Sequence, residues 1–407
     1  MTVQGRPDVL QKVVDGRLCS GCGACAALAP EVVTMDLSTD GYLRPKRSKP
    51  LSEAQGAAIS SVCPGLGMSL QADDRFDHVL WGPYLSVSSG YAEDPDLRHN
   101  ASSGGILSAL LVHLLDSGEV DCVLQIAADP KRPIGNQTVF SNSADDVFQS
   151  AGSRYAPSAP LAEIGTLLDG NMRYAFVGKP CDVAALRTMG RSDPRVGARF
   201  PYMLSFFCAG VPSLKGANEI LSEMGVSENE LAQFRYRGDG WPGYATAIKK
   251  EGGTTRMSYA ESWGGILSRH VQFRCKICPD GTGSFADVVC ADAWEADEKG
   301  YPVFSEAEGV SLVMGRTKRG EALIENAKAA GRIKTQPFDI DGLAAIQPGQ
   351  TQKRRFVLSR LLALRMTGRV VPCYHGFHLW QNARKARLGR NLKNLLGTLR
   401  RIARGRL

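Results

Sequence analysis

The spacing of the first cysteines constrains this chain more than any other feature of its sequence. The run "CSGCGACAALAP", residues 19 to 30, holds Cys19, Cys22 and Cys25, with two residues between successive cysteines. Such a loop can give three thiolates to an iron–sulfur cluster, which needs four soft ligands. In two-cluster ferredoxins a cysteine–proline pair ends the run and serves the other cluster. Here that position reads Ala29-Pro30, so only one cluster is expected in this part of the chain.

The fourth ligand is predicted further along the chain. Cys63 in "SSVCPG" precedes a proline, as such a ligand typically does. The intervening "PEVVTMDLSTDGYLRP" has apolar strand-like segments and an Asp-Gly turn. We therefore predict a ferredoxin-like module over residues 1–72, with a 4Fe-4S cluster on Cys19, Cys22, Cys25 and Cys63. A zinc knuckle is the alternative, although zinc sites favour paired C-x2-C arms or cysteine–histidine mixtures.

A second group of cysteines lies in the middle of the chain. Cys181 and Cys208 stand alone in "VGKPCDVAAL" and "SFFCAGVP", whereas Cys275 and Cys278 form a C-x2-C pair in "FRCKICPDG". One pair and two single cysteines could close a second cluster site. On spacing alone, Cys181 and Cys208 could also be buried apolar residues. Cys290 lies in an apolar run, where a core role is expected.

The overall composition agrees with a globular protein that keeps its thiols reduced. The chain is 43% apolar and 22% charged. It has no uncharged apolar stretch of about 18 residues, the length expected of a membrane span. The N-terminal segment carries charges throughout and has no apolar core, unlike a signal peptide. We therefore expect a cytoplasmic protein, in which C-x2-C runs bind metal or take part in redox chemistry more often than they form disulfides.

The region from 80 to 350 alternates strand and helix patterns, which predicts an α/β (α+β) domain. Buried strands are expected within 120–128, 173–182 and 199–210, and helices within 104–118 and 214–226.

Six motifs in this region resemble the beta-subunit family of coenzyme F420 hydrogenases and dehydrogenases. They are "HNASSGGILSALLVHLL", "GSRYAPS", "FVGKPCDVAALR", "FFCAGVPS", "FRYRGDGWPG" and "CKICPDGTGSFADVVCADAW". The same family includes ferredoxin-dependent reductases of chlorophyll metabolism. The resemblance implies two halves, 80–165 and 170–350, with FAD and a second 4Fe-4S cluster on Cys181, Cys208, Cys275 and Cys278. Where many members read Gly-Asp, this chain has Cys290-Ala291-Asp292.

The flavin site is expected at several loops. Ser102-Ser103-Gly104-Gly105 precedes a helix, and its hydroxyls, glycine backbone and helix N-terminus could cradle a pyrophosphate, although an ordinary helix cap looks similar. The other expected flavin contacts are Ser153, Arg154, Tyr155, Gly178, Lys179, Pro180, Arg237, Trp241 and Asp292.

Two residues are candidates for a catalytic role. Lys179 could stabilise a negatively charged reduced flavin, with a solvated turn lysine as the alternative. His99 could act as a general acid, with a structural histidine as the alternative.

The C-terminal segment 353–407 is strongly basic. It has fifteen Lys or Arg and no Asp or Glu, whereas the rest of the chain has 34 basic and 41 acidic residues. Residues 384–407 place leucines at helical spacing among nine cations. This pattern predicts an amphipathic helix that binds an acidic partner such as ferredoxin or an anionic membrane surface, or that is simply solvated. No nucleic-acid recognition module is visible.

Together these features predict an iron–sulfur flavoprotein oxidoreductase. The leading hypothesis passes electrons from a ferredoxin-type donor through two 4Fe-4S clusters to FAD and then to a small organic acceptor. One alternative makes the deazaflavin coenzyme F420 the hydride partner, as in a beta-type subunit. Another makes the chain an electron-transfer subunit without its own substrate.

Overall fold

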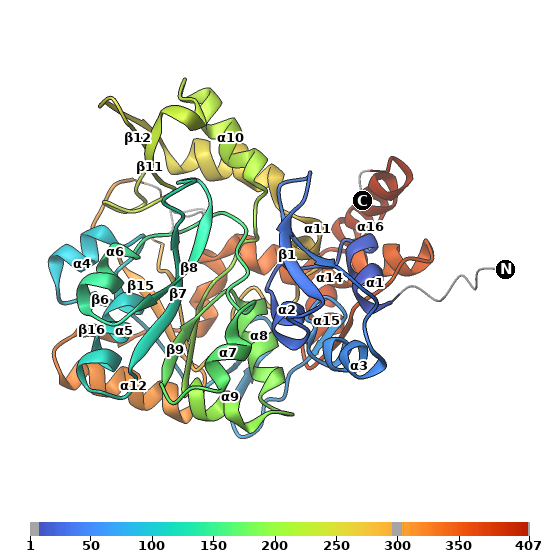
Figure 1. The fold of residues 1–407 in the computed structure, drawn as a ribbon, viewed down its shortest axis with the longest axis horizontal. Helices are drawn as coiled ribbons and strands as arrows, with labels where there is room; N and C mark the ends of the chain where they lie inside the picture. Colours follow the sequence, from blue (N-terminus) through green and yellow to red (C-terminus); the bar gives the residue numbers. More distant parts are fainter. Residues whose placement is uncertain (1–7, 295–302, 304, 406–407) are drawn as a thin grey trace.

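A mixed eight-stranded sheet forms the centre of the molecule in the computed structural model, which describes residues 8–294, 303 and 305–405 (Figure 1). The strands lie in the order β16-β6-β15-β14-β10-β9-β7-β8. In chain order they are β6 (Ser86–Ala92), β7 (Cys122–Ala128), β8 (Asn136–Ser141), β9 (Tyr174–Val177), β10 (Tyr202–Phe206), β14 (Val288–Asp292), β15 (Ser311–Gly315) and β16 (Ile333–Pro337).

The middle of the sheet is parallel. β7, β9, β10 and β14 run in one direction, and the strands on either side of them are antiparallel. The carboxyl ends of the four parallel strands therefore meet at one edge, the usual place for a ligand in such sheets. The strands expected within 120–128, 173–182 and 199–210 are all present, and the α/β fold class is confirmed.

Both faces of the sheet are covered. Successive side chains of each strand point to opposite faces, so each strand contributes apolar residues to both layers. One face packs against helices α5 (Ile106–Asp116) and α12 (Lys318–Ala329), and the other packs against α8 (Pro180–Met189). The first face takes Val123, Ala175, Leu204 and Val288, and the second takes Leu124, Phe176, Met203 and Val289. These continuous apolar strands are typical of a doubly covered sheet.

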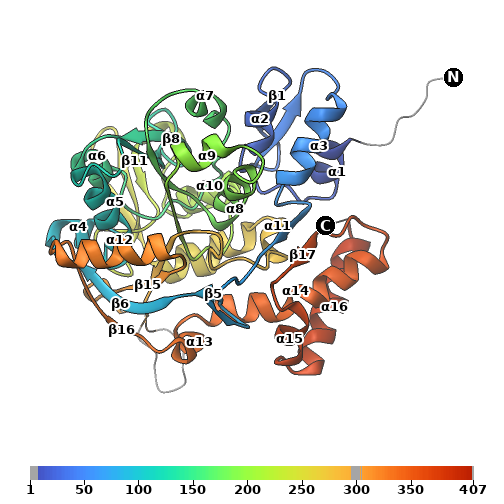
Figure 2. The ribbon, with the colours of Figure 1, turned by 90° about the horizontal axis from the view of Figure 1, so that it is seen from below.

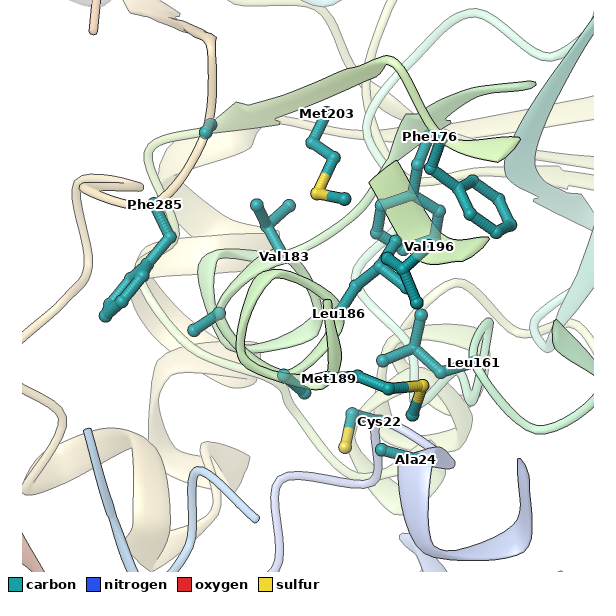
Figure 3. Packing of buried hydrophobic residues seen from close by; sticks show 14 of the residues in the cluster. Cys22, Ala24, Leu161, Phe176, Val183, Leu186, Met189, Val196, Met203 and Phe285 are labelled. Atoms are coloured by element: carbon teal, nitrogen blue, oxygen red, sulfur yellow. The ribbon is translucent and has the colours of Figure 1, made fainter. Parts of the chain in front are cut away.

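The N-terminal module packs directly on α8. It consists of α1 (Val9–Asp15), α2 (Ala24–Leu28), the hairpin β1 (Val33–Leu37) and β2 (Leu43–Arg47), and α3 (Glu53–Val62). Figure 3 shows Cys22 and Ala24 beside Leu161 and Met189, in the same buried cluster as one face of the sheet. The module and the large domain thus share one hydrophobic core.

A second, smaller layer covers one end of the large domain. It contains the sheet β11 (Leu231–Arg235), β12 (Ala245–Lys249) and β13 (Thr254–Met257), with α10 (Leu214–Glu223) beside it (Figure 1). The shorter elements are β4 (Phe76–His78), β5 (Gly82–Tyr84), α4 (Pro95–Asn100), α6 (Ala144–Gln149), α7 (Ile164–Leu168), α9 (Pro194–Arg199), α11 (Phe273–Lys276) and α13 (Leu343–Ile346).

The C-terminal segment is helical and lies against the N-terminal module (Figure 2). It contains α14 (Pro348–Met366), α15 (Leu379–Arg384) and α16 (Leu388–Ala403), and the short strand β17 (Cys373–His375) pairs with β3 (Gly67–Ser69) of the N-terminal part. Among the described helices, none is both long enough and apolar enough to cross a bilayer.

Candidate functional site

The first cysteine quartet lines one cavity between the N-terminal helices. Cys19, Cys22 and Cys25 come from the loop before and the start of α2, and Cys63 is the residue directly after α3. The loop can turn this tightly because Gly21 and Gly23 have φ angles of 81° and 89°, a region that glycine reaches without strain. Four cysteines from two separate parts of the sequence therefore share one enclosure.

The thiols of this first quartet are buried beside one another. Burial, with Asp182 and Cys63 adding to it, raises the pKa of Cys22 to about 12. Burial likewise raises the pKa of Cys63 to about 11, and the nearby Cys19 adds to the effect. Thiolates in such a place need a positively charged partner, which a metal centre supplies. The Ser20 hydroxyl beside them is buried with no hydrogen-bond partner among the described residues. These residues fit an iron–sulfur cluster, which the cavity would hold.

The turn before α2 leaves no room for a larger residue at Gly23. A Cβ atom there would lie 2.7 Å from the backbone nitrogen of Ala162, at a φ of +89°. We expect Gly23→Ala to cost about 1–3 kcal/mol of stability and to lower iron content, because αL geometry strains an alanine and the cysteine loop must shift. Gly56→Ala is the matched control, since Gly56 lies in α3 with open space around it. Thermal unfolding and iron analysis of both variants test this; equal behaviour would contradict it.

The second quartet gathers at the carboxyl edge of the sheet. Cys181 lies in the first turn of α8, directly after β9, and Cys208 follows β10. Cys275 belongs to α11, and Cys278 follows it. Burial, to which Cys275 and Cys278 add, raises the pKa of Cys208 to about 12, and burial raises that of Cys181. The backbone N–H of Val211 points at the Cys275 sulfur, 3.4 Å away.

Cys181, Cys208, Cys275 and Cys278 lie close enough to act on one another electrostatically, and their role as cluster ligands stays a prediction. This placement fits a cluster bound by thiolates, with backbone N–H groups directed at sulfur. No group of three or more His, Cys, Asp or Glu side chains in residues 8–294, 303 and 305–405 converges on a single metal ion.

Lys179 lies beside the second quartet in a buried ion pair. Its Nζ is 2.8 Å from Asp182 Oδ2 and donates to Ser158 Oγ at 2.8 Å, and the residue is 6% exposed. Burial works against its charge, but Asp182 and Cys181 raise the pKa of Lys179. It is therefore no solvated turn lysine. The neighbouring Gly178 carbonyl accepts from Ser205 Oγ at 2.8 Å, and Pro180 starts α8.

Hydrogen bonds join the side chains of Arg237, Trp241 and Asp292 next to the carboxyl edge of the sheet. The Arg237 guanidinium donates to both Asp292 oxygens, at 2.8 and 2.7 Å, and Trp241 Nε1 donates to Asp292 Oδ1 at 2.8 Å. Burial opposes the charge of Arg237, but Asp292 raises its pKa. Arg237 also lies over the rings of Tyr259 and Trp294, 4.8 and 4.9 Å from their centroids. The predicted loop residues thus meet in a cluster of aromatic and oppositely charged side chains, which we call the Arg237 wall.

The serine loop is tied to the Arg237 wall. Ser102 Oγ donates to the Arg237 carbonyl at 3.2 Å and accepts from the Ser153 N–H. Ser103 Oγ donates to the Val310 carbonyl at 3.1 Å. A Cβ atom on Gly104 would lie 2.6 Å from the Ser311 nitrogen, and Gly105, with φ 75°, starts α5. The loop therefore contacts the Arg237 wall closely, and its role in binding a pyrophosphate stays a prediction.

The other candidate residues are placed differently. Arg154 donates to the carbonyls of Phe234 and Pro133, both at 2.8 Å, so its guanidinium holds the small sheet to the large domain. Tyr155 packs its ring on Trp263, with centroids 4.8 Å apart. His99 is exposed at the end of α4. Its carbonyl accepts from the Gly240 N–H at 3.0 Å, and its role as a general acid stays a prediction.

Comparison with known proteins identifies the family. Two models of the coenzyme F420 hydrogenase/dehydrogenase beta subunit match the chain, the N-terminal one over residues 87–164 and the C-terminal one over residues 171–341. The chain belongs to the coenzyme F420 hydrogenase/dehydrogenase beta-subunit family. The family resemblance predicted from the motifs is therefore confirmed.

Several relatives of the F420 beta-subunit family cover most of the chain. The coenzyme F420 hydrogenase subunit beta of Methanococcus voltae is 25% identical over 72% of the chain and 99% of its own length. A subunit of the F(420)H(2) dehydrogenase of Methanosarcina mazei is 22% identical over 81% of the chain and 88% of its own length. A coenzyme F420-dependent sulfite reductase of Methanocaldococcus jannaschii is 23% identical over 78% of the chain, which spans about half (47%) of that relative.

A solved structure shows the same fold. A chain of the F420-reducing [NiFe] hydrogenase complex from Methanosarcina barkeri superposes with a TM-score of 0.57 at 20% identity, covering 73% of this chain and 98% of that one.

Sequence reasoning missed three residues of the site. Asp182 and Trp294 stand inside the family motifs "KPCD" and "ADAW", so their motif positions were a usable signal. Tyr259 comes from a separate segment, and nothing in its sequence context indicated that it would reach Arg237. Cys290 lies in β14 with its side chain in the apolar cluster of the sheet, as the sequence predicted.

Proposed function

We propose that the chain is an iron–sulfur flavoprotein subunit of an F420-linked oxidoreductase, and that it binds two 4Fe-4S clusters, FAD and coenzyme F420. The observation that carries this proposal is the cavity that the first quartet lines, together with a second group of cysteines that act on one another electrostatically near the carboxyl edge of the sheet. A bound flavin would couple the two-electron hydride chemistry of a deazaflavin to one-electron iron–sulfur carriers. The relatives named as F420 hydrogenase or dehydrogenase subunits support this proposal over the ferredoxin-linked reductase that the sequence favoured.

The residues of the chain would act mainly by position and charge. The first quartet would hold one cluster, and Cys181, Cys208, Cys275 and Cys278 would hold the other. Lys179 keeps a buried positive charge beside the second quartet, where it would favour an anionic reduced cofactor. The Ser102–Gly105 loop and the Arg237–Asp292 pair would position the flavin. Relatives that are subunits of larger enzymes support partner subunits for this chain as well.

A ferredoxin-dependent reductase of a small organic molecule is the second candidate. It is supported by the basic α16, whose Ile402 packs in the same cluster as Cys19 and Cys63. An acidic carrier bound to this helix would be close to the first quartet.

Turnover under anaerobic conditions distinguishes the two functions. The iron-loaded, flavin-loaded protein is mixed either with reduced F420 or with reduced ferredoxin, and flavin reduction is followed. Fast reduction by F420 supports the proposal. Reduction by ferredoxin alone would replace it with the second candidate, and activity only after a co-purifying subunit is added would indicate an electron-transfer subunit without its own substrate.

The exposed face of α16 gives a prediction about partners. Leu388, Leu392 and Leu396 are 85%, 54% and 53% exposed on this helix, and its neighbours Arg390 and Lys393 are exposed cations. If an acidic protein binds here, Arg390→Glu with Lys393→Glu should weaken its binding at low salt by about tenfold, because the attraction is electrostatic. Binding to a plant-type ferredoxin and to vesicles with anionic lipid is measured side by side. Unchanged binding to both the ferredoxin and the vesicles would show that the helix does not take part in partner recognition.

A further inference from the structure

One buried arginine connects the two cysteine quartets. Arg274 directly precedes Cys275 of the second quartet, and its Nη2 donates to the carbonyl of Pro64 at 2.7 Å. Pro64 directly follows Cys63 of the first quartet. The side chain is 1% exposed. A single guanidinium thus reaches from the segment of one quartet to the segment of the other.

The guanidinium of Arg274 is not paired with any carboxylate of residues 8–294, 303 and 305–405. Among the described residues, none forms an ion pair with Arg274, and its Nε has no hydrogen-bond partner. Its nearest aromatic neighbour is Tyr374, with the ring centroid 5.7 Å from Cζ, and the Tyr374 hydroxyl is also buried with no partner in the described part of the chain. The titratable groups that face Arg274 are the Tyr374 hydroxyl and cysteines of both quartets. It acts on Cys19 and Cys63 of the first quartet and on Cys181, Cys275 and Cys278 of the second.

An isolated buried cation is costly, and proteins keep such charges by pairing them. Thiolate-bound iron–sulfur clusters in the two quartets would supply negative charge near this guanidinium. The positive charge of Arg274 would therefore be balanced when both quartets hold iron–sulfur clusters.

We propose that Arg274 is a positioning residue that serves as the shared counter-cation of the two iron–sulfur sites and raises the reduction potential of both. This inference rests on the proposed two-cluster function. Its positive charge favours the more negative, reduced state of either site, because reduction potential depends on nearby charge. When one electron moves between the sites, one site is oxidised and the other reduced by one electron, and the same guanidinium compensates the charge before and after.

The test is a potentiometric titration, followed by electron paramagnetic resonance, of the full-length protein and its variants. Arg274→Gln should shift the reduction equilibrium of both sites at least tenfold toward the oxidised form, which is about 59 mV for one electron. Lys353→Gln should shift only the second site, because Lys353 Nζ donates to the Cys208 carbonyl at 2.7 Å. Arg274→Lys, which keeps the charge, should restore most of both shifts.

The outcomes separate this inference from the proposed function. Two sites with full iron and unchanged potentials in Arg274→Gln would overturn the inference, and so would a shift of one site only. A wild-type protein without two iron–sulfur signals would instead overturn the proposed function. If Arg274→Gln loses its iron, Arg274→Lys decides: iron retained in both quartets supports a need for charge, and iron lost there too overturns it in favour of packing.

Discussion

The Cys63→Ser variant is expected to hold about four irons per chain where the unchanged protein holds about eight, while its flavin stays bound. Cys63 directly follows α3 and lines the cavity that Cys19, Cys22 and Cys25 also line. Serine oxygen is a poor ligand for iron in a thiolate cluster, because such clusters select soft sulfur. The second quartet comes from different segments, so its iron should remain.

Iron and flavin are measured per chain after anaerobic purification. Cys373→Ser is the matched control, because Cys373 is exposed on β17, where its Sγ lies 3.0 Å from Nε2 of His375. That variant should keep all of its iron. An unchanged iron content in Cys63→Ser would show that the fourth ligand of the first site is another residue.

The Asp292→Ala variant is expected to lose about 3–5 kcal/mol of unfolding free energy, because it leaves the Arg237 guanidinium buried without a counter-ion. The side chains of Arg237 and Asp292 are 3% and 17% exposed, so the pair is largely shielded from water. Trp241 loses its hydrogen-bond acceptor in the same change. If this wall positions the flavin, flavin content should fall together with stability.

Chemical denaturation and flavin content test this variant. The control is Asp121→Ala, which removes a carboxylate from the solvent-exposed pair with Arg173. Exposed pairs contribute little to stability, so the control should behave almost like the unchanged protein. Equal stability losses in both variants would contradict a special role for the buried pair, and loss of stability without loss of flavin would limit Asp292 to a structural role.

The sequence was informative where chemistry depends on short, local patterns. Three cysteines in one loop and a distant cysteine–proline pair indicated a shared site, and the structure places them around one cavity. Cys181 and Cys208 were expected at strand ends, and adjacent parallel strands bring their ends together. The six motifs were sufficient to identify the family.

The remaining features depend on contacts between distant segments. Arg154 stood in a motif as an expected flavin contact, and its guanidinium donates to the backbone carbonyls of Phe234 in the small sheet and of Pro133. Arg274 carried no signal beyond its place next to Cys275, because only the folded chain shows that it reaches Pro64. The contact of the basic tail with the N-terminal module likewise joins distant segments, through the pairing of β17 with β3 and a shared apolar cluster. An arginine in a sequence does not reveal which of many acceptors it will meet.

The metal and flavin content of anaerobically purified protein tests the central proposal most directly. The two quartets and the Arg237 wall predict about eight irons, about eight acid-labile sulfides and one FAD per chain, with a flavin absorption band at about 450 nm. Zinc in place of iron, with no flavin, would contradict the account of both sites.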